Sequence, residues 1–467
     1  MKNVIAIFDI GKTNKKRLLF DQQYRVVDEQ SDNFDDITDE DGDACDDLAS
    51  LTRWLHESLA DVLMNPAYDV RAVNVTTFGA SLVHIDRDGQ PITPLYSYLK
   101  PFSETLHRQF YDTYGGEAEV SRQTASPILG NLNSGLQIYR IKYEHPDWFE
   151  RIAHSLHLPQ YASFLLTGQP HTDLTSVGCH TMLWDFDRQQ YHEWVEREGL
   201  LPKLPALFPG DGVMMVSPLD KGEAIPVGVG LHDSSSALIP YLASFSEPGN
   251  ASPFVLLSTG TWCISMNPFN ATPLTDEELQ YDCLCYLTYR GQPVKSSRLF
   301  AGHEHEHQTK RLSEHFGVSV DTYKTVHFDP TLIYQLRARH TAPTGEHKPE
   351  QLSSMKGSLF SGRDLTTFGT YAEAYHQLML DIVAQQLLST ELVLAGSPVR
   401  KLFVDGGFGK NPVYMHLLAA AFPDIEVYAA SVAQATALGA ALAIHKHWNP
   451  EPLPEGLIEL KRFESVL

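Results

Sequence analysis

The stretch Val4–Phe20, VIAIFDIGKTNKKRLLF, has the pattern of a β-hairpin. An apolar run typical of a buried strand ends at Asp9, and a second strand-like run, RLLF, follows a polar turn. The turn contains Gly11, Lys12, Thr13 and Asn14. The letters GKT also occur in P-loops, but that motif requires a glycine in place of Ala6 and a helix after the turn. We therefore expect backbone N–H groups, Lys12 and Thr13 to face an anion, with Asp9 as a metal ligand; an ordinary polar hairpin turn is the alternative.

A second strand–turn–strand pattern occurs in the second half of the chain. Phe254–Met266, FVLLSTGTWCISM, has the pattern of a strand, a small polar turn and a second strand. The turn contains Ser258, Thr259, Gly260 and Thr261. Hydroxyl groups are hydrogen-bond donors, and a glycine lets the backbone approach a phosphate closely. The two hairpins therefore predict a pair of phosphate-binding turns that face each other across a cleft.

Two further glycine clusters follow strand-like runs. In Leu402–Pro412, LFVDGGFGKNP, a tight turn leads into a helix that opens at Asn411, and we expect this turn to lie under a nucleoside. An ordinary strand-to-helix turn is the alternative. In Ile225–Asp233, IPVGVGLHD, a carboxylate stands just before a predicted helix. Asp233 is either a helix N-cap or a general base that takes a proton from a substrate hydroxyl.

Length and composition limit the possible architectures and partners. A chain of 467 residues exceeds one hydrophobic core, so we expect two α/β domains, residues 1–243 and 244–467, divided in the Ser-, Pro- and Gly-rich stretch 243–253. A net charge of −22 argues against nucleic acid and anionic membranes as partners and favours a small ligand. Five cysteines and the lack of a long apolar run predict a reducing, cytoplasmic location. The acidic run Asp32–Asp47 lacks EF-hand spacing and is expected to be a solvated loop.

His303–His307, HEHEH, contains the HExxH pattern of zinc metalloproteases. A zinc hydrolase needs a third ligand and an open groove, and no histidine of the metzincin type follows downstream. Mixtures of His and Glu also suit a solvated helix, on which His303 and His307 share one face. We expect a helix at the cleft edge, from which His303 or Glu304 could reach substrate; a zinc hydrolase is the alternative.

Taken in order, the segments DIGKTN, TTFG, GLHD, STGTW, VDGGFGKNP and ATALGAALA resemble the FGGY family of carbohydrate kinases, and within it the L-fuculokinase and L-rhamnulokinase branch. The resemblance spans nearly the whole chain. It implies an α/β fold of two actin/hexokinase/Hsp70-like (ribonuclease H-like) domains with a catalytic cleft between them, the first binding sugar and the second ATP. The implied cofactors are ATP and Mg²⁺, and the implied partner is a small-molecule sugar; a homodimer is left open.

The resemblance also implies roles for individual residues. Asp233 is expected to be the catalytic base, and Asp9 is expected to organise Mg²⁺. The triphosphate is expected at Lys12, Thr13, Asn14, Thr259, Gly260 and Thr261. The adenosine is expected at Gly406, Gly407 and Asn411. The sugar is expected at Thr77, Phe78, Gly79, Ser81 and His232.

The expected reaction is transfer of the ATP γ-phosphate to a hydroxyl of a ketose. The resemblance implies a 6-deoxyketohexose such as L-fuculose or L-rhamnulose, or a ketopentose such as xylulose. Ser81 stands where deoxyketose kinases usually carry an aspartate, so the sugar stays open. The alternative is an actin/Hsp70-like ATPase that acts as a nucleotide-gated binding module without sugar kinase activity, because such a scaffold needs no base at Asp233.

Overall fold

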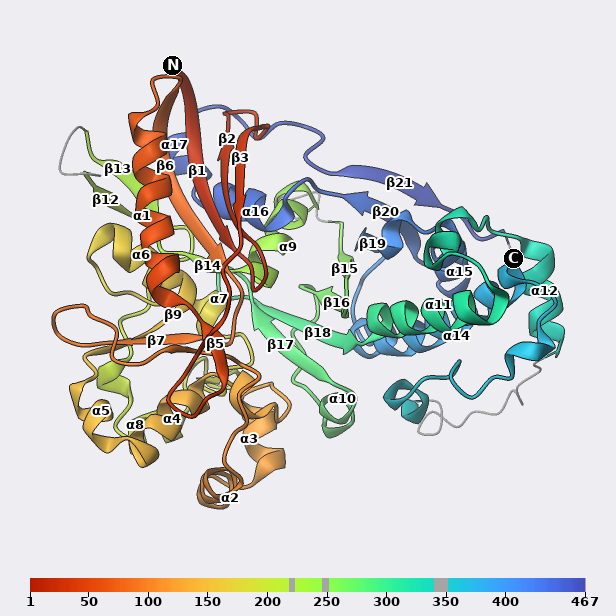
Figure 1. The fold of residues 1–467 in the computed structure, drawn as a ribbon, viewed down its shortest axis with the longest axis horizontal. Helices are drawn as coiled ribbons and strands as arrows, with labels where there is room; N and C mark the ends of the chain where they lie inside the picture. The colour runs from red at the N-terminus through yellow and green to blue at the C-terminus, as the bar shows by residue number, and fades with distance from the viewer. Residues whose placement is uncertain (218–222, 246–251, 340–351, 467) are drawn as a thin grey trace.

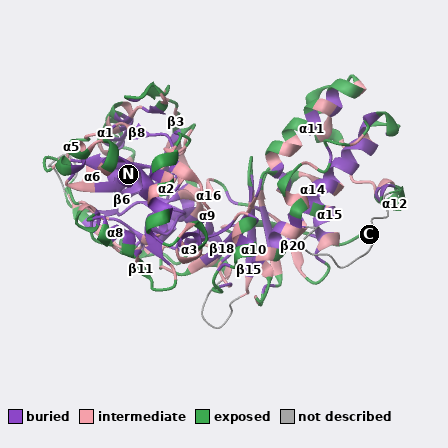
Figure 2. Ribbon diagram, turned by 90° about the horizontal axis from the view of Figure 1, so that it is seen from below, coloured by how far each residue is buried: buried purple, intermediate pink, exposed green. Residues whose placement is uncertain are grey.

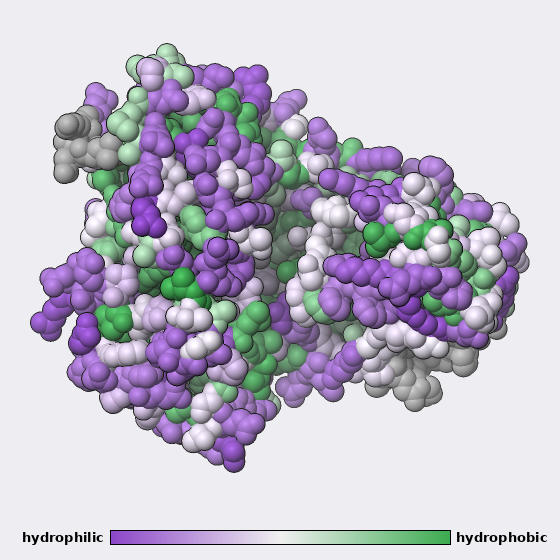
Figure 3. Space-filling view, viewed as in Figure 1, coloured by the Kyte–Doolittle hydropathy of each residue, from purple (hydrophilic) through white to green (hydrophobic). Residues whose placement is uncertain are grey.

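The computed structural model describes residues 1–217, 223–245, 252–339 and 352–466, which form two lobes with a hollow between them (Figures 1 and 3). Each lobe is built on a seven-stranded mixed sheet covered by helices. Of the stretch in which we expect the domain boundary, residues 246–251 lie outside the described residues. All five cysteines are buried and free. In the part of the chain that the structure describes, no helix has the length and apolar character needed to cross a bilayer.

The first sheet contains the predicted N-terminal hairpin. In spatial order its strands are β12 (Val213–Val216), β13 (Ile225–Gly228), β6 (Tyr68–Thr77), β1 (Lys2–Ile10), β2 (Lys15–Phe20) and β3 (Val26–Asp32), and β14 (Leu231–His232) also pairs with β6. Strand β1 is antiparallel to β2 and parallel to β6. Residues Val4–Phe8 are all buried, as expected for a central strand with a parallel neighbour. The predicted hairpin is thus confirmed.

The second sheet repeats this arrangement. In spatial order its strands are β17 (Cys283–Leu287), β18 (Pro293–Leu299), β16 (Cys263–Asn267), β15 (Phe254–Thr259), β19 (Lys401–Gly406), β20 (Glu426–Ser431) and β21 (Glu459–Phe463). Strands β15 and β16 form the second predicted hairpin, and β15 runs parallel to β19. Because parallel strands end at the same edge, the turns that follow β15 and β19 lie side by side.

Helices from both halves of the chain cover the first sheet. One face packs against α1 (Leu48–Met64) and α6 (Leu158–Thr167), and the other against α9 (Asp233–Phe245) and α16 (Ala435–Ala443). The amide Nδ2 of Asn74 on β6 donates to the carbonyl of Ala440 on α16 (2.8 Å). Helix α16 therefore joins the C-terminal half of the chain to the N-terminal lobe through one shared hydrophobic core.

In the second lobe the long helix α14 is central. Helix α14 (Tyr371–Leu394) packs against β16 and β18 and contacts α11 (Ala301–Phe316), α12 (Pro330–Arg339) and α15 (Pro412–Ala421). Figure 2 shows buried residues concentrated in the sheets and in the inner faces of these helices, with exposed residues along the outer surface of α11. The sequence HEHEH lies in the first turns of α11, so the predicted helix is confirmed.

Smaller elements complete the first lobe around a separate hydrophobic cluster. They include α2 (Glu104–Thr113), α3 (Glu117–Gln123), α4 (Gly135–Glu144), α5 (Pro146–Arg151), α7 (Leu174–Val177) and α8 (Glu193–Arg197). The short strands are β4 (Ile37–Thr38), β5 (Ala44–Asp46), β7 (Leu82–Ile85), β8 (Leu95–Tyr96), β9 (His154–His157), β10 (Trp184–Asp185) and β11 (Gln190–Tyr191). Helix α10 (Asp276–Gln280) lies in the second lobe and contacts α3, and α17 (His445–Trp448) follows α16.

The acidic run Asp32–Asp47 is only in part the solvated loop that its charge predicts. The carboxylates of Asp39, Asp41 and Asp43 surround the ammonium group of Lys100 at 2.6, 2.9 and 2.8 Å. The side chain of Asp39 is fully buried in this contact. Lys100, which lies outside the run, pairs with these three carboxylates. A prediction based on neighbouring charges alone could not find that partner.

Candidate active site

Asp233 lies at the edge where β14 ends and α9 begins. Its Oδ1 accepts the backbone N–H of Ser234 (2.6 Å) and the Ser234 hydroxyl (3.3 Å). Its Oδ2 has no hydrogen-bond partner among the residues that the structure describes. Burial raises the pKa of Asp233 to about 6, because a charged carboxylate is poorly solvated there. One oxygen therefore holds the first turn of the helix, and the other is free to accept a proton.

Asp9 is the second carboxylate of the site and lies at the end of β1. Its Oδ2 accepts a hydrogen bond from the hydroxyl of Thr436, at the start of α16 (2.5 Å). Burial, together with the charge of Asp233, raises the pKa of Asp9 to about 6, although the hydrogen bond from Thr436 and the charge of Lys16 act in the opposite direction. Two neighbouring half-buried carboxylates repel each other and supply oxygen donors, which fits a hard divalent cation such as Mg²⁺.

The predicted sugar residues gather beside these carboxylates. Thr77 lies opposite His232 where β6 pairs with β14. Gly79 packs against the His232 ring so closely that a Cβ would lie 2.7 Å from it. Burial lowers the pKa of His232 to about 4, so its imidazole is neutral. The Nε2 of His232 lies 3.3 Å from Cys179 Sγ and 3.3 Å from Asp233 Oδ1, which fixes the ring against the Asp233 carboxylate.

The segment around Ala80 carries buried polar atoms without partners. The Nε2 of Gln137 donates to the carbonyl of Ala80 (2.8 Å), but Gln137 Oε1 is buried and has no hydrogen-bond partner among the described residues. Ser81 is 1% exposed, and its hydroxyl is likewise buried without a hydrogen-bond partner among the described residues. The nearby Phe78 is also buried, and its carbonyl accepts the hydroxyl of Thr77 (2.8 Å). Unpaired buried polar atoms are costly, so a hydrogen-bonding ligand that reached this segment would remove that cost.

The turn of the first hairpin offers fewer groups to a phosphate than its sequence predicts. Lys12 Nζ lies 2.7 Å from Asp46 Oδ2 and 3.8 Å from Asp36 Oδ1, so the acidic run holds its ammonium group. Thr13 and Asn14 are exposed in the turn, which the Gly11 N–H closes by donating to the Asn14 carbonyl (2.9 Å). Lys12 would have to leave Asp46 to reach a nucleotide.

Thr259 connects the two glycine turns of the second lobe. Its Oγ1 donates to the carbonyl of Asp405 (2.5 Å) and accepts the backbone N–H of Phe408 (3.0 Å). In the structure this hydroxyl holds the neighbouring turn, and its contact with the triphosphate stays a prediction. Gly260 and Thr261 stay exposed at the hairpin tip. Gly302 at the start of α11 packs against that tip, since a Cβ there would lie 1.8 Å from the Gly260 carbonyl oxygen.

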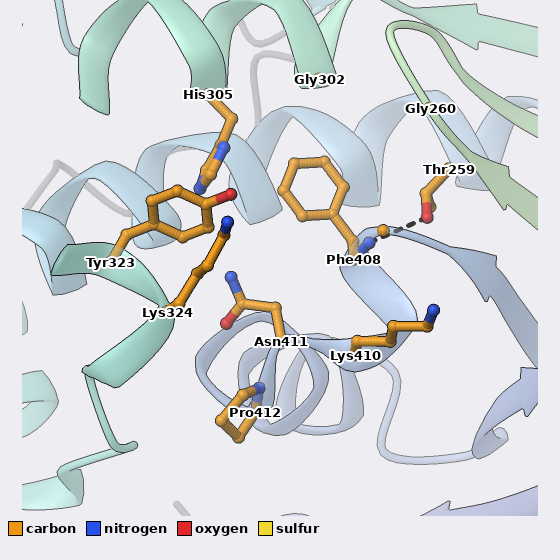
Figure 4. A pocket seen from close by; sticks show the side chains of 11 residues that line it. Thr259, Gly260, Gly302, His305, Tyr323, Lys324, Phe408, Lys410, Asn411 and Pro412 are labelled. Carbon is orange, nitrogen blue, oxygen red and sulfur yellow. Dashed lines mark hydrogen bonds between the residues drawn. The ribbon is translucent and has the colours of Figure 1, made fainter. Parts of the chain in front are cut away.

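A cavity of about 460 Å³ lies beside this hairpin, between α11 and α15 (Figure 4). Its volume is within the range of small-molecule sites. Four of the predicted residues line it, namely Thr259, Gly260, Gly407 and Asn411. Gly406 does not line it: this residue has a φ of +91° and packs against the Thr259 carbonyl, where a Cβ would lie 2.0 Å from the oxygen. Close packing of the two turns accounts for this glycine, and its place at the adenosine stays a prediction.

Sequence reasoning missed several residues of the site. The cavity is also lined by Gly302, His305, Tyr323, Lys324, Phe408, Lys410 and Pro412. Tyr323 and Lys324 come from the 3₁₀ turn Val320–Thr325, VDTYKT, which carries no motif. His305 and Thr436 stand in segments that the sequence did single out, HEHEH and ATALGAALA, but nothing in either pattern indicates which of its side chains faces the site.

Gly439 controls the position of the helix that carries Asp233. A Cβ at this residue of α16 would lie 1.8 Å from the carbonyl oxygen of Ser236 in α9. We expect Gly439→Ala to destabilise the protein, because an overpacked core costs about 1–3 kcal/mol, whereas alanine gains only about 1 kcal/mol of helix propensity over glycine. The melting temperature and kcat should both fall.

The matched control for this substitution is Gly362→Ala, since an added Cβ there meets no atom within 4 Å. This variant should melt and turn over like the wild type. Equal melting temperatures for Gly439→Ala and Gly362→Ala would show that α16 and α9 can move apart without cost.

Comparison with known proteins extends the resemblance to both halves of the chain. The N-terminal domain of the FGGY family of carbohydrate kinases matches residues 4–240, and the carbohydrate kinase FGGY C-terminal domain matches residues 251–452. L-fuculokinase of Escherichia coli (strain K12) is 26% identical over 288 residues, covering 57% of this chain and 56% of that protein. Rhamnulokinase of Mannheimia succiniciproducens is 24% identical over 288 residues, covering 58% and 55%. The chain thus spans about half the length of the curated relatives it matches.

Solved structures match over nearly the whole chain. A carbohydrate kinase from Novosphingobium aromaticivorans has a TM-score of 0.79 and 24% identity, covering 99% of this chain and 96% of that chain. A xylulose kinase from Lactobacillus acidophilus has a TM-score of 0.78 and 15% identity, covering 99% and 94%. These likenesses confirm the predicted two-domain α/β sugar kinase fold. Since the family domains match residues 4–240 and 251–452, the chain belongs to the FGGY family of carbohydrate kinases.

Proposed function

We propose that this protein is an ATP-dependent kinase that transfers the γ-phosphoryl group of ATP to a hydroxyl of a ketose. The observation that carries the proposal is Asp233, whose unpaired Oδ2 and raised pKa stand beside a second carboxylate, Asp9. Curated relatives named L-fuculokinase and rhamnulokinase support a 6-deoxyketohexose such as L-fuculose or L-rhamnulose, and structures named xylulose kinase support a ketopentose. Five free buried cysteines are consistent with a cytoplasmic location.

In this mechanism Asp233 is the general base. A carboxylate with a pKa of about 6 is ionised at pH 7.5 and is a stronger base than an ordinary aspartate. The sugar hydroxyl gives its proton to Asp233 Oδ2 while its oxygen bonds to the γ-phosphorus. The bond from that phosphorus to the bridging oxygen breaks, and ADP leaves. His232 stays neutral beside Asp233 and does not compete for the proton.

The remaining residues position the reactants. We propose that Gly260 and Thr261 at the exposed hairpin tip contact the phosphates and that the cavity beside Asn411 binds the nucleoside; the exposure of the tip and the cavity support this. Asp9 would hold Mg²⁺, which supplies positive charge to the β- and γ-phosphates when bound. The buried hydroxyl of Ser81 and the unpaired Gln137 Oε1 suit a polyhydroxylated substrate. We propose that residues 1–243 bind the sugar and carry Asp233, and that residues 244–467 bind ATP.

The test is ADP release with Mg-ATP against a panel of L-fuculose, L-rhamnulose, D-xylulose, L-xylulose, D-ribulose, L-ribulose and glycerol. We expect one ketose to raise ADP release well above the rate without sugar, because only a hydroxyl placed at Asp233 can accept the phosphoryl group. Slow ATP hydrolysis that no sugar stimulates would instead favour a nucleotide-gated binding module of the same fold.

A further inference from the structure

The three histidines of the HEHEH stretch do not share one environment. His303 and His307 are exposed on the outer face of α11; the His303 ring stacks on Phe300 at 4.3 Å and lies 6.4 Å from the His307 ring. His305 is half-buried and lines the cavity beside Asn411, as Figure 4 shows. Within the described residues, neither His303 nor His307 belongs to a group of three His, Cys, Asp or Glu side chains close enough to hold a metal. The structure thus separates His305 from the metal-binding pattern.

Aromatic rings fix the orientation of His305. Its ring meets Tyr323 edge-on at 4.9 Å, Phe408 at 5.3 Å and Tyr375 at 5.8 Å. Its Nε2 lies 3.0 Å from the hydroxyl oxygen of Tyr375, a residue of α14 that is fully buried. Burial lowers the pKa of His305 to about 4, so the imidazole is neutral and one of its nitrogens can accept a hydrogen bond.

The hydrogen-bond roles in this cluster follow from Asn411. The Oδ1 of Asn411 accepts the backbone N–H groups of Val413 (3.0 Å) and Tyr414 (3.3 Å) as the N-cap of α15. Its Nδ2 must therefore face the Tyr375 hydroxyl, 2.7 Å away, and donate to it. A hydroxyl oxygen can accept two hydrogen bonds, but among the described residues His305 Nε2 is the one group left to take the Tyr375 proton, so we assign the hydroxyl as the donor and Nε2 as the acceptor.

Two donors remain unused at the end of this chain of hydrogen bonds. With Nε2 of His305 assigned as the acceptor, the ring proton is on Nδ1, which has no hydrogen-bond partner among the described residues. The second hydrogen on Asn411 Nδ2 also has none there. Both residues line the cavity, whereas the ring nitrogens of a purine and the oxygens of a ribose are acceptors.

We propose that His305 is a binding residue of the nucleoside site: its Nδ1–H and the second N–H of Asn411 face the acceptors of a purine nucleoside, and the Tyr375 hydroxyl links the two side chains and holds them in place. This inference rests on the proposed function, because it takes the cavity to be the nucleoside site. It assigns the histidine inside the HExxH pattern to nucleotide recognition and not to zinc.

The test compares His305→Phe, which keeps an aromatic ring, and Tyr375→Phe, which removes one oxygen, with the controls His303→Phe and His307→Phe on the outer face. Calorimetry with ATP and with ADP, in the absence of sugar, measures nucleotide binding without turnover. We expect both cluster variants to weaken nucleotide binding at least about fivefold, because a buried donor or acceptor loses its partner. The outer-face variants should bind as the wild type does.

Steady-state kinetics separates a role in nucleoside binding from a general structural defect. The KM for ATP should rise in His305→Phe and Tyr375→Phe, while kcat at saturating ATP and the KM for sugar change by less than about threefold, since the chemistry lies at Asp233. The double variant should lose little more nucleotide affinity than the single variant that binds less tightly, because both residues belong to one chain of hydrogen bonds. If His305→Phe does not fold, Tyr375→Phe alone decides the question.

The two possible failures are distinguishable. A wild type that binds ATP, with cluster variants that bind it equally well, would overturn the role of His305 and leave the kinase proposal in place. A wild type that binds no adenine nucleotide would overturn the proposed function itself, and this inference with it.

Discussion

Asp233→Asn should lower kcat by about 10²–10⁴-fold, the range that general-base catalysis contributes. An asparagine can still accept the Ser234 N–H through its side-chain oxygen, so the start of α9 should be preserved. What is lost is the basic Oδ2, which has no other partner in the described residues. ADP release with the preferred sugar measures the effect, and an unchanged KM for ATP is the control that the nucleotide site is intact. Activity within threefold of the wild type would remove Asp233 from the mechanism.

The raised pKa of Asp233 adds a pH dependence with a definite sign. The pKa of Asp233 is about 6 in the folded protein against 3.8 for an ordinary aspartate, so the contribution of this residue to stability should fall as the pH rises from about 4 to about 6 and then level off. At pH 7.5 Asp233→Asn should therefore melt above the wild type, and at pH 4 the difference should vanish. Over the same range, wild-type kcat/KM should rise with pH as the base ionises. A variant less stable than the wild type at pH 7.5 would contradict the burial of this charge.

Asp9→Asn should lower kcat by on the order of 10²-fold or more, because a bound metal contributes several kcal/mol and each 1.36 kcal/mol is tenfold in rate. The Thr436 hydroxyl can still donate to the asparagine oxygen, so α16 should stay in place. Added Mg²⁺ with ADP should raise the melting temperature of the wild type and do so much less for Asp9→Asn. The control is Asp61→Asn, an exposed aspartate of α1. A variant with full Mg²⁺-dependent stabilisation would show that the metal is held elsewhere.

The two hairpins were predictable because their signal is local. Buried apolar runs interrupted by small polar turns occur at Val4–Phe20 and Phe254–Met266, and β1 with β2 and β15 with β16 follow these patterns. The positions of Asp9 and Asp233 were predictable for the same reason, since each stands where a strand ends. The sequence thus contains enough information for the two hairpins and for the position of each carboxylate at a strand end.

The sequence could not show which polar side chains of the two turns are free to bind a ligand and which already bond to another residue. Lys12 pairs with Asp46, and Thr259 bonds to Asp405 and Phe408, across 34 and nearly 150 residues of chain. A motif shows which residue type stands in a turn, but not which distant partner already uses its hydrogen-bonding groups. Only the folded structure therefore shows that the side chains of Lys12 and Thr259 already have hydrogen-bond partners.

The position of helix α16 likewise depends on partners that are distant in the sequence. Its sequence, ATALGAALA, is apolar on all sides and could be buried in either lobe. The structure places it against α9 and the first sheet, where Thr436 reaches Asp9 from 427 residues away in the chain. Within this segment the glycine at position 439 is the one residue whose type indicates the packing, because the close approach to Ser236 leaves no room for a side chain.

The most direct test of the account is to identify the product that wild type and Asp233→Asn form from Mg-ATP and each ketose of the panel. Mass spectrometry of the sugar, together with the amount of ADP released, measures this. We predict one phosphorylated ketose per ADP for the wild type and almost none for Asp233→Asn. ADP released as inorganic phosphate accumulates, at equal rates in both proteins and with no phosphorylated sugar, would contradict the kinase assignment.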